Sequence, residues 1–130
     1  LSGNPVAMAA GIATLKELKA NPPYQRLDAM SAKIEAGLTA ACQAANIPYQ
    51  FNRVGSMWTL FFNPDAVTDY DTAKKSDAAK FGRFFWAMMD RGVYLPCSQF
   101  EAAFTSAAHT LEHIDMTIAA ARDVFEEWSS

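Results

Sequence analysis

The sequence has no surplus of positive charge and no long hydrophobic run. Its 130 residues carry 11 Lys and Arg against 14 Asp and Glu, a formal net charge of −3. Such a chain lacks the basic field that attracts phosphate backbones or anionic lipid. Its apolar runs are far shorter than the roughly 20 residues that span a bilayer, and no charged-then-apolar signal segment opens it. We therefore expect no nucleic-acid partner, no membrane partner, and a cytoplasmic location, or a plastid if the source is a plant or alga.

Cysteine is also scarce. Cys42 and Cys97 are too few for a disulfide framework, and their spacing fits no zinc motif. We interpret both as small buried hydrophobic side chains, with a reactive thiol as the alternative. The sequence assigns neither of them a role in function.

Two patterns suggest a metal ion, and neither is complete. The string His109-Thr110-Leu111-Glu112-His113 matches the inverted zinc-protease pattern. If Thr110 caps the last helix, however, His109 lies outside it and the two imidazoles do not share a face. Aspartates cluster between residues 65 and 77, but no glycine stands at the turning position of a calcium loop and no glutamate closes one. We predict no metal site, leave the roles of both histidines open, and predict a solvated surface loop over residues 64–76.

The stretch that organises the chain is residues 50–62. Two β-prone runs face each other across Gly55-Ser56, and glycine accepts the positive φ required at the first central position of a type II′ turn, so the stretch predicts a hairpin. Its second strand, Met57 to Phe62, is nearly all apolar, so we expect it to be covered rather than exposed to water on both faces. Shorter strands are predicted at residues 93–95 and 102–105.

Helices are predicted on both sides of this hairpin. Asn4 before Pro5 opens the first, because the Asn side chain can cap free N–H groups and proline gives up a donor that the helix would not use. The predicted segments are Pro5 to about Lys19, Tyr24 to about Asn46, Asp77 to Arg91, and a last helix capped by Thr110. The apolar stripes of the last three are Leu27, Met30, Ile34, Leu38, Ala41 and Ala45; Phe81, Phe84, Phe85 and Met88; and Leu111, Ile114, Ile118, Ala121, Phe125 and Trp128.

These elements predict an α+β fold. We expect a small antiparallel sheet of three or four strands with helices packed on one face, preceded by a connector helix. The small side chains between Val6 and Ala13 let another backbone approach closely, so residues 1–20 are expected to be a connector helix to an absent large domain, and residues 21–130 the small domain. The chain also begins at Leu1 without methionine, as expected for a piece of a longer protein.

Glu101 is the carboxylate whose surroundings stand out. It lies in a mostly apolar, irregular stretch, Leu95 to Ser106, with only small polar side chains for company. Such a carboxylate must reach solvent at a cleft or find a partner, because burying it unpaired is costly. From the residues alone, a solvent-facing glutamate and a functional acid both remain open.

Four stretches carry a resemblance to a known family, in order and across essentially the whole chain. They are Leu1-Ser2-Gly3-Asn4-Pro5-Val6-Ala7-Met8-Ala9-Ala10-Gly11, Arg53-Val54-Gly55-Ser56-Met57-Trp58-Thr59-Leu60-Phe61-Phe62, Gly92-Val93-Tyr94-Leu95-Pro96 and Gln99-Phe100-Glu101-Ala102-Ala103-Phe104-Thr105-Ser106-Ala107-Ala108-His109. Together they resemble the C-terminal portion of the glutamate-1-semialdehyde 2,1-aminomutase family, within the class III pyridoxal-phosphate aminotransferases of fold type I. The resemblance implies the C-terminal small domain of such an enzyme.

The resemblance also implies an activity, isomerisation of glutamate 1-semialdehyde to 5-aminolevulinate for tetrapyrrole (porphyrin) biosynthesis, in a full-length homodimer. Pyridoxal phosphate (PLP, or PMP in its amino form) would be held by a lysine, an aspartate and phosphate-binding groups of the large domain. No cofactor-binding residue is therefore expected in this fragment, which alone should be inactive. Of the family's active-site groups only the glutamate of the Phe-Glu-Ala motif carries over, onto Glu101, where it would help shape the substrate pocket.

Two rival interpretations remain. One is another class III ω-aminotransferase; relatives that act on ornithine-type substrates commonly place an arginine in the late segment to clamp a carboxylate, and here none stands between Gly92 and Ala121. The other is a stand-alone α+β interaction or ligand-binding module. Exposure of the Ala-rich helix face between Val6 and Ala13 would favour a fragment over such a module.

Overall fold

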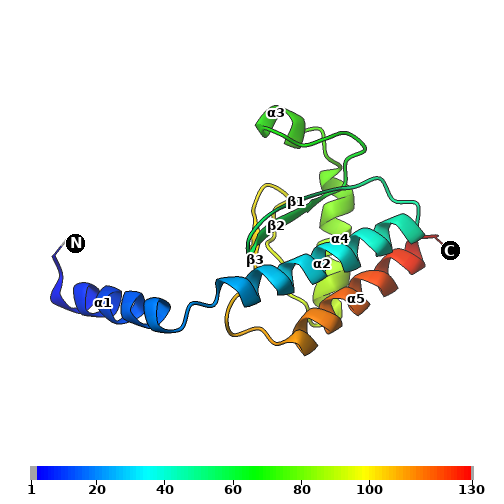
Figure 1. The fold of residues 1–130 in the computed structure, drawn as a ribbon. Helices are drawn as coiled ribbons and strands as arrows, with labels where there is room; N and C mark the ends of the chain where they lie inside the picture. The colour runs from blue at the N-terminus through cyan, green and yellow to red at the C-terminus, as the bar shows by residue number, and fades with distance from the viewer. Residues whose placement is uncertain (1–2, 130) are drawn as a thin grey trace.

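The computed structural model describes residues 3–129, so Leu1, Ser2 and Ser130 lie outside the described residues. Figure 1 shows a small sheet with helices packed against it and one helix standing apart. The elements are α1 (Pro5–Ala20), α2 (Tyr24–Ala44), β1 (Gln50–Val54), β2 (Met57–Phe61), α3 (Tyr70–Ala73), α4 (Ala78–Asp90), β3 (Ala103–Phe104) and α5 (Leu111–Ser129). The sheet is antiparallel with strand order β1-β2-β3. The predicted α+β class and the four predicted helices are confirmed.

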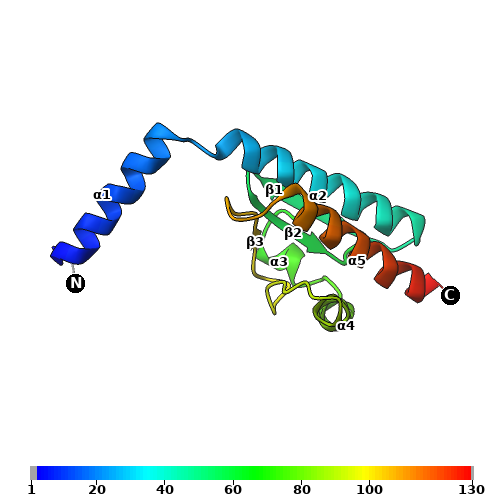
Figure 2. The same cartoon turned by 90° about the horizontal axis from the view of Figure 1, so that it is seen from below.

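Helix α1 begins as predicted and then makes no core of its own. Asn4 Oδ1 accepts hydrogen bonds from the backbone N–H groups of Val6 (2.9 Å) and Ala7 (3.2 Å). None of its residues is buried, and Met8 and Leu15 are 55% and 68% exposed. Figures 1 and 2 show the helix extending away from the body, joined through residues 21–23. The apolar side of α1 is therefore uncovered within the described chain.

The predicted hairpin is confirmed, and its geometry follows from one glycine. Val54 pairs with Met57, which leaves a two-residue loop, and Gly55 has φ +57° while Ser56 is not in the positive-φ region. A positive φ at the first central position alone is the pattern of a type II′ turn, whose twist matches that of the strands.

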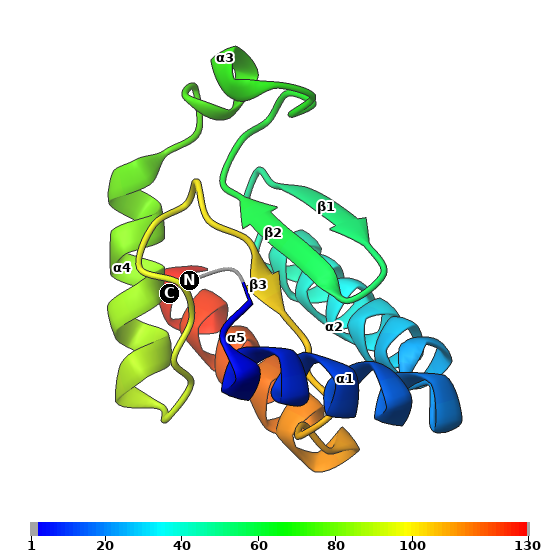
Figure 3. The same cartoon turned by 90° about the vertical axis from the view of Figure 1, so that its left-hand side faces the viewer.

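The hairpin register decides which face of the sheet is buried. Trp58 and Leu60 of β2, together with Phe62 just after it, join one continuous core with buried residues of α2, α4 and α5. Figure 3 shows the three strands side by side with these helices around them, and Figures 1 and 2 show α2 and α5 running alongside each other. The prediction that helices pack on one face is confirmed.

The opposite face of β2 is only partly covered. Phe61 packs in a small separate cluster with Val67 and Ala73, but Met57 is 41% exposed and its cross-strand partner Phe104 is 64% exposed. Water therefore reaches one face of a strand whose sequence is almost entirely apolar.

Aromatic side chains fill the centre of the core. Phe84 and Phe125 stack with ring centroids 5.1 Å apart and planes 17° apart, and Phe62 meets Phe125 edge-on at 6.1 Å. Trp128 closes the group at 5.6 Å from Phe125. Phe84 and Phe125 are 1% and 0% exposed, so the predicted stripes of α4 and α5 meet each other here. Leu111 is an exception to the predicted α5 stripe, since it is 59% exposed.

Residues 64–76 form the predicted polar connection, but it contains a helical turn that the sequence interpretation missed. Asp69 Oδ1 accepts a hydrogen bond from Thr72 N (2.8 Å), and Thr72 Oγ1 accepts one from Asp69 N (3.0 Å), which is a capping box for α3. The Thr72 backbone N–H, and after it the Thr72 hydroxyl, donate to the Asp69 carboxyl and hold its pKa below its ordinary value. Four residues are too few to show a helical period in sequence.

The predicted strand at residues 93–95 is wrong. After α4 the N–H of Gly92 donates to Met89 O (2.9 Å) and that of Val93 donates to Met88 O (2.9 Å), which is a Schellman cap with Gly92 at φ +79°. The Val93 N–H is thus committed to the helix end, and Pro96 has no N–H to offer a neighbouring strand.

Within residues 3–129, none of the helices is long and apolar enough to cross a membrane.

The two long helices α2 and α5 are in tight contact at Gly37. A Cβ atom added there would lie 2.7 Å from three side-chain atoms of Ile118. In an open helix Gly→Ala is favourable by about 1 kcal/mol, but overpacking a filled core costs about 1–3 kcal/mol. We therefore expect Gly37→Ala to lower the free energy of unfolding, by up to about 2 kcal/mol in urea denaturation.

The matched control for this substitution is Gly82→Ala in α4. An added Cβ at Gly82 meets nothing within 4 Å, so this variant should be stabilised by roughly 0.5–1 kcal/mol. In the background of Ile118→Ala, the penalty at Gly37 should disappear. Equal effects at the two glycines would refute the close contact between α2 and α5.

Candidate functional site

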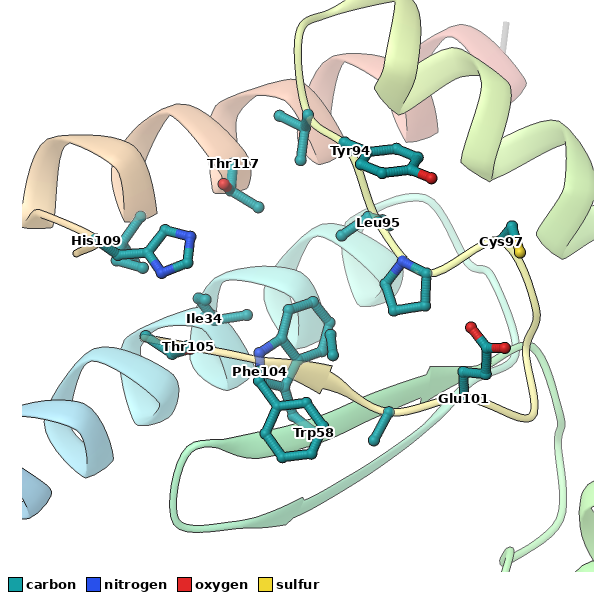
Figure 4. Close-up of a pocket in the computed structure, with 15 residues that line it drawn as sticks. Ile34, Trp58, Tyr94, Leu95, Cys97, Glu101, Phe104, Thr105, His109 and Thr117 are labelled. Atoms are coloured by element: carbon teal, nitrogen blue, oxygen red, sulfur yellow. The ribbon is translucent and has the colours of Figure 1, made fainter. Parts of the chain in front are cut away.

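Glu101 lies where an irregular segment passes into β3. Its N–H donates to Ser98 O (3.1 Å), and its carbonyl oxygen accepts from Thr59 Oγ1 at 3.5 Å. The side chain is exposed and stands at the edge of a cavity, as Figure 4 shows. The carboxylate thus reaches solvent at a cleft, which is one of the two outcomes that its surroundings allowed.

A buried side chain two residues earlier anchors this segment. Gln99 is 2% exposed, and with its carboxamide turned so that both ends are paired, it donates to Asp77 O (3.2 Å) and accepts from Phe62 N–H (3.1 Å). The Gln99 side chain therefore joins the end of β2 to the start of α4. The sequence interpretation missed this residue, because a glutamine in a polar-looking loop gives no sign that it will be buried.

The segment after β3 is fixed in a similar way. Thr105 N–H donates to Ser56 O in the hairpin turn (3.0 Å), and Ser31 Oγ of α2 donates to Thr105 Oγ1 (2.9 Å). Both hydroxyl-bearing residues are buried, and Arg26 donates to Ala107 O further along. Glu101 is therefore flanked on both sides by residues tied to the core.

Arg53 holds the hairpin against α2. Its guanidinium donates to Glu35 Oε2 (2.7 Å), to Asp28 Oδ1 (2.6 Å) and to the carbonyl of Gly55 (3.0 Å). The hydrogen bonds to Glu35 and then to Asp28 raise the pKa of Arg53 above its ordinary value. This cluster fixes the hairpin turn, and the carbonyl oxygen of Ser56 in that turn accepts the Thr105 N–H.

The cavity beside Glu101 has a volume of about 430 Å³. Its walls come from α2, β2, the segment between α4 and β3, β3 itself and the start of α5, and Figure 4 shows these side chains converging from separate elements. Ile34, Leu95 and Ile114 make apolar walls, whereas Glu101 and His109 bring polar groups to the lining. A concave, mainly apolar space with a few polar groups is the usual form of a small-molecule site.

His109 lies outside α5, as predicted, but its ring lies beside that of His113. Thr110 caps α5 as predicted, since Thr110 Oγ1 accepts from His113 N (3.3 Å). His113 Nδ1 also accepts from Thr110 N (3.2 Å), which folds that ring back over the helix start, so the two imidazoles are neighbours with centroids 6.3 Å apart. Within residues 3–129, no three His, Cys, Asp or Glu side chains lie close enough to share a metal ion.

The two cysteines differ, which also corrects the sequence interpretation. Cys97 is exposed, so its prediction as a buried residue is wrong, whereas Cys42 is 0% exposed in the core. Burial raises the pKa of the Cys42 thiol from 9.0 to about 12. Cys97 lies in an irregular segment at the surface, whereas Cys42 lies on the buried stripe of α2. Composition alone does not distinguish an exposed cysteine from a buried one.

We expect one thiol per chain to react with DTNB at pH 8 under native conditions, because the thiolate is the reactive species and Cys42 is held protonated. Cys97→Ser should abolish this fast reaction, and denaturant should expose Cys42. Since the folded state keeps the proton longer than the unfolded state, the free energy of unfolding should fall as the pH rises from about 9 to about 12. Two fast-reacting thiols in the folded chain would contradict this assignment.

The lysines of the chain do not suit a cofactor aldehyde. A Schiff-base lysine needs desolvation or a nearby cation to become a nucleophilic amine. Of the six lysines in the sequence, none is buried within the described residues, and Lys33 and Lys74 are paired with Asp115 and Asp71. The residues present therefore do not form a pyridoxal-phosphate site.

The architecture defines a class of protein. An antiparallel three-stranded sheet with helices on one face, preceded by a projecting helix, is the C-terminal domain of a transaminase-fold PLP enzyme. The chain superimposes on a glutamate-1-semialdehyde aminomutase from Pseudomonas aeruginosa with a TM-score of 0.85 over 96% of this chain and 28% of that one, at 24% identity. A transaminase with PLP bound gives a TM-score of 0.76 over 95% of this chain and 27% of that one, at 23% identity. These likenesses establish the fold.

Sequence comparison identifies closer relatives, although no family model matches the chain. It is 49% identical over 126 residues to the glutamate-1-semialdehyde 2,1-aminomutase of Rhodopirellula baltica, covering 97% of this chain and 29% of that protein. It is 54% identical over 125 residues to the enzyme of the same name from Myxococcus xanthus, covering 96% and 29%. The chain thus matches the C-terminal portion of glutamate-1-semialdehyde 2,1-aminomutases and spans less than a third of their length.

Proposed function

We propose that this chain is the C-terminal domain of a glutamate-1-semialdehyde 2,1-aminomutase. The whole protein would exchange the amino and oxo positions of glutamate 1-semialdehyde to give 5-aminolevulinate, the precursor of tetrapyrroles. The observation that carries the proposal is identity near 50% over almost the entire chain with proteins of that name. The matched regions cover 97% and 96% of this chain.

We propose the same division of the chain that the sequence suggested. Residues 21–130 are the C-terminal small domain and residues 1–20 the connector to a large domain of the same protein. Two observations support this proposal: the relatives are more than three times as long as the matched region, and the apolar side of α1 has no cover among the described residues. A homodimer in the cytoplasm, or in a plastid, completes the proposal.

In this proposal Glu101 is the one active-site group that the chain contributes. Its carboxylate stands at the mouth of a cavity on a segment held by Gln99 and Thr105, so it is both accessible and positioned. A fixed negative charge is a poor receptor for a substrate carboxylate, and the described stretch between Gly92 and Ala121 contains no arginine to offset it. Glu101 therefore shapes the substrate pocket and orients polar groups of the substrate other than its carboxylate.

Pyridoxal phosphate, when bound by the rest of the protein, supplies an electron sink for the substrate. Since the lysines of this chain do not suit the cofactor, no step of the reaction is assigned to them. The chain alone, mixed with pyridoxal phosphate and substrate, should give no turnover and no borohydride-stable adduct at a unique lysine. Stoichiometric labelling of one lysine would overturn this division of roles.

The test of the proposed function uses the full-length protein that contains this chain. Supplied with the cofactor and glutamate 1-semialdehyde but no external amino donor, it should form 5-aminolevulinate. An ω-aminotransferase, the runner-up, would need an added amino donor and would release a second oxo product. Dependence on such a donor would reject the aminomutase in favour of that enzyme. No activity either with or without the donor would favour a separate binding module.

A further inference from the structure

An apolar patch lies uncovered on the sheet face that carries no helices. Met57 of β2 is the direct cross-strand partner of both Val54 in β1 and Phe104 in β3, so the three side chains share this face beside the hairpin turn. They are 41%, 73% and 64% exposed in that order. Single exposed apolar side chains are normal, whereas contiguous ones mark an interaction site. We call these three residues the turn-end patch.

The other half of the same face is covered by the chain itself. Asn52 Nδ2 donates to Val67 O (2.8 Å), which brings the connection after β2 over the far end of the strands. Phe61 is buried there against Val67 and Ala73. This face is therefore buried where the described chain supplies a cover, and the turn-end patch is the part that lacks one.

The chemistry of the patch selects the kind of partner. A shallow groove of about 170 Å³ runs beside it over β1 and β2. Of the described residues that line this groove, Arg53 is the only charged one, and its guanidinium is already paired with Glu35 and Asp28. Methionine and aromatic side chains adapt to apolar surfaces. The patch therefore suits an apolar protein surface.

The patch lies at the end of the domain from which α1 leaves. Asp28, near the start of α2, pairs with Arg53 (2.6 Å), and Arg53 also donates to Gly55 O in the hairpin turn (3.0 Å). The turn is thus beside the start of α2, one short connection from α1. Figure 3, seen from the side toward which α1 projects, shows β1 and β2 in front of α2, so the face without helices points the same way. With 16 residues, α1 is about 24 Å long, so a segment that precedes it begins within reach of this face.

We propose that the turn-end patch is the docking surface for the part of the same polypeptide that precedes this chain. The inference rests on the proposed function, in which this chain is the C-terminal portion of a protein more than three times as long. The domain is then held at two places, by α1 and by the patch. Because Phe104 follows Glu101 by three residues, the same contact fixes the Glu101 segment against the rest of the protein.

The test compares two methionines in the full-length protein that contains this chain. Met57 and Met116 are 41% and 58% exposed in this domain, and Met116 lies on α5, outside the sheet face. Peroxide converts exposed methionine to its sulfoxide, which peptide mass spectrometry measures. Met57 should be oxidised about tenfold more slowly in the full-length protein than in the 130-residue chain, because docking excludes the oxidant, whereas Met116 should keep its rate.

A substitution gives a second measurement that does not depend on the control methionine. Met57→Glu places a charge on the patch. In the 130-residue chain it should shift the melting temperature by less than about 2 °C, because the site is exposed. In the full-length protein it should lower the melting temperature by about 4 °C or more, because docking buries the charge. Met116→Glu is the matched control and should have little effect in either protein.

Three results would overturn the proposal. The first is equal oxidation of Met57 in the two proteins, which requires no variant and so does not depend on Met57→Glu folding. The second is an equal effect of Met57→Glu in both. The third is protection of Met57 that is lost on dilution of either protein, which would assign the patch to a second copy. No measurement uses substrate, so the docking surface and the aminomutase activity can fail independently.

Discussion

Replacing Phe125 by alanine should lower the free energy of unfolding by about 3–5 kcal/mol, the usual range for deleting a buried phenylalanine. Phe125 is 0% exposed and contacts the rings of Phe62, Phe84 and Trp128, so the substitution removes contacts with three aromatic rings at once. A domain of this size has about 5–15 kcal/mol of stability in total. Urea denaturation followed by circular dichroism measures the loss directly.

The control is the same substitution at an exposed phenylalanine. Phe100 is 52% exposed, so Phe100→Ala should change the free energy of unfolding by less than about 1 kcal/mol. If Phe125→Ala proves too unstable to study, Phe125→Leu should still cost about 1–1.5 kcal/mol, because it keeps most of the apolar volume. Similar midpoints for the Phe125 and Phe100 variants would refute the central position assigned to Phe125.

Replacing Glu101 by glutamine in the full-length enzyme should reduce kcat/KM for glutamate 1-semialdehyde by about 10- to 100-fold. Glutamine keeps the size of the side chain and its exposure at the cavity edge but removes the negative charge, and this range corresponds to about 1.4–2.7 kcal/mol of transition-state stabilisation. The expectation rests on the proposed function and on the place of Glu101 beside the cavity. Steady-state formation of 5-aminolevulinate is the measurement.

Glu112→Gln provides the matched control, since Glu112 is exposed on the first turn of α5 and does not line the cavity. Its kcat/KM should remain within about twofold of the wild-type value. The melting temperature of each variant separates lost chemistry from lost structure. If the Glu101 and Glu112 variants had the same activity, Glu101 would be an ordinary surface residue.

Periodicity and capping chemistry predicted most of the fold. The stripes through Ile34, Phe84 and Ile118 are long enough to show a helical repeat, and Asn4, Gly55 and Gly92 mark boundaries by local chemistry that needs no tertiary information. The wrong strand at residues 93–95 shows the limit of this approach. Its β-branched and aromatic residues favour a strand, but the helix cap before it had already used the Val93 N–H.

The site was harder to predict than the fold. Resemblance selected Glu101, whereas the residues that position it, Gln99 and Thr105, became evident only when distant backbone atoms were seen beside them. The turn-end patch is similar, because Met57 and Phe104 become neighbours only when β2 pairs with β3. Such features arise from contacts between residues far apart in the chain, and a single sequence does not contain them.

The supports of the Glu101 segment have one more consequence, which concerns how freely the neighbouring sequence can vary. Gln99 contacts main-chain atoms of Phe62 and Asp77, and the Thr105 N–H contacts the main chain of Ser56. Main-chain groups are the same whichever amino acid carries them. The contacts to positions 56, 62 and 77 therefore do not depend on the side chains there, although Phe62 is also held by its place in the core, whereas the contacts of Gln99 depend on its carboxamide.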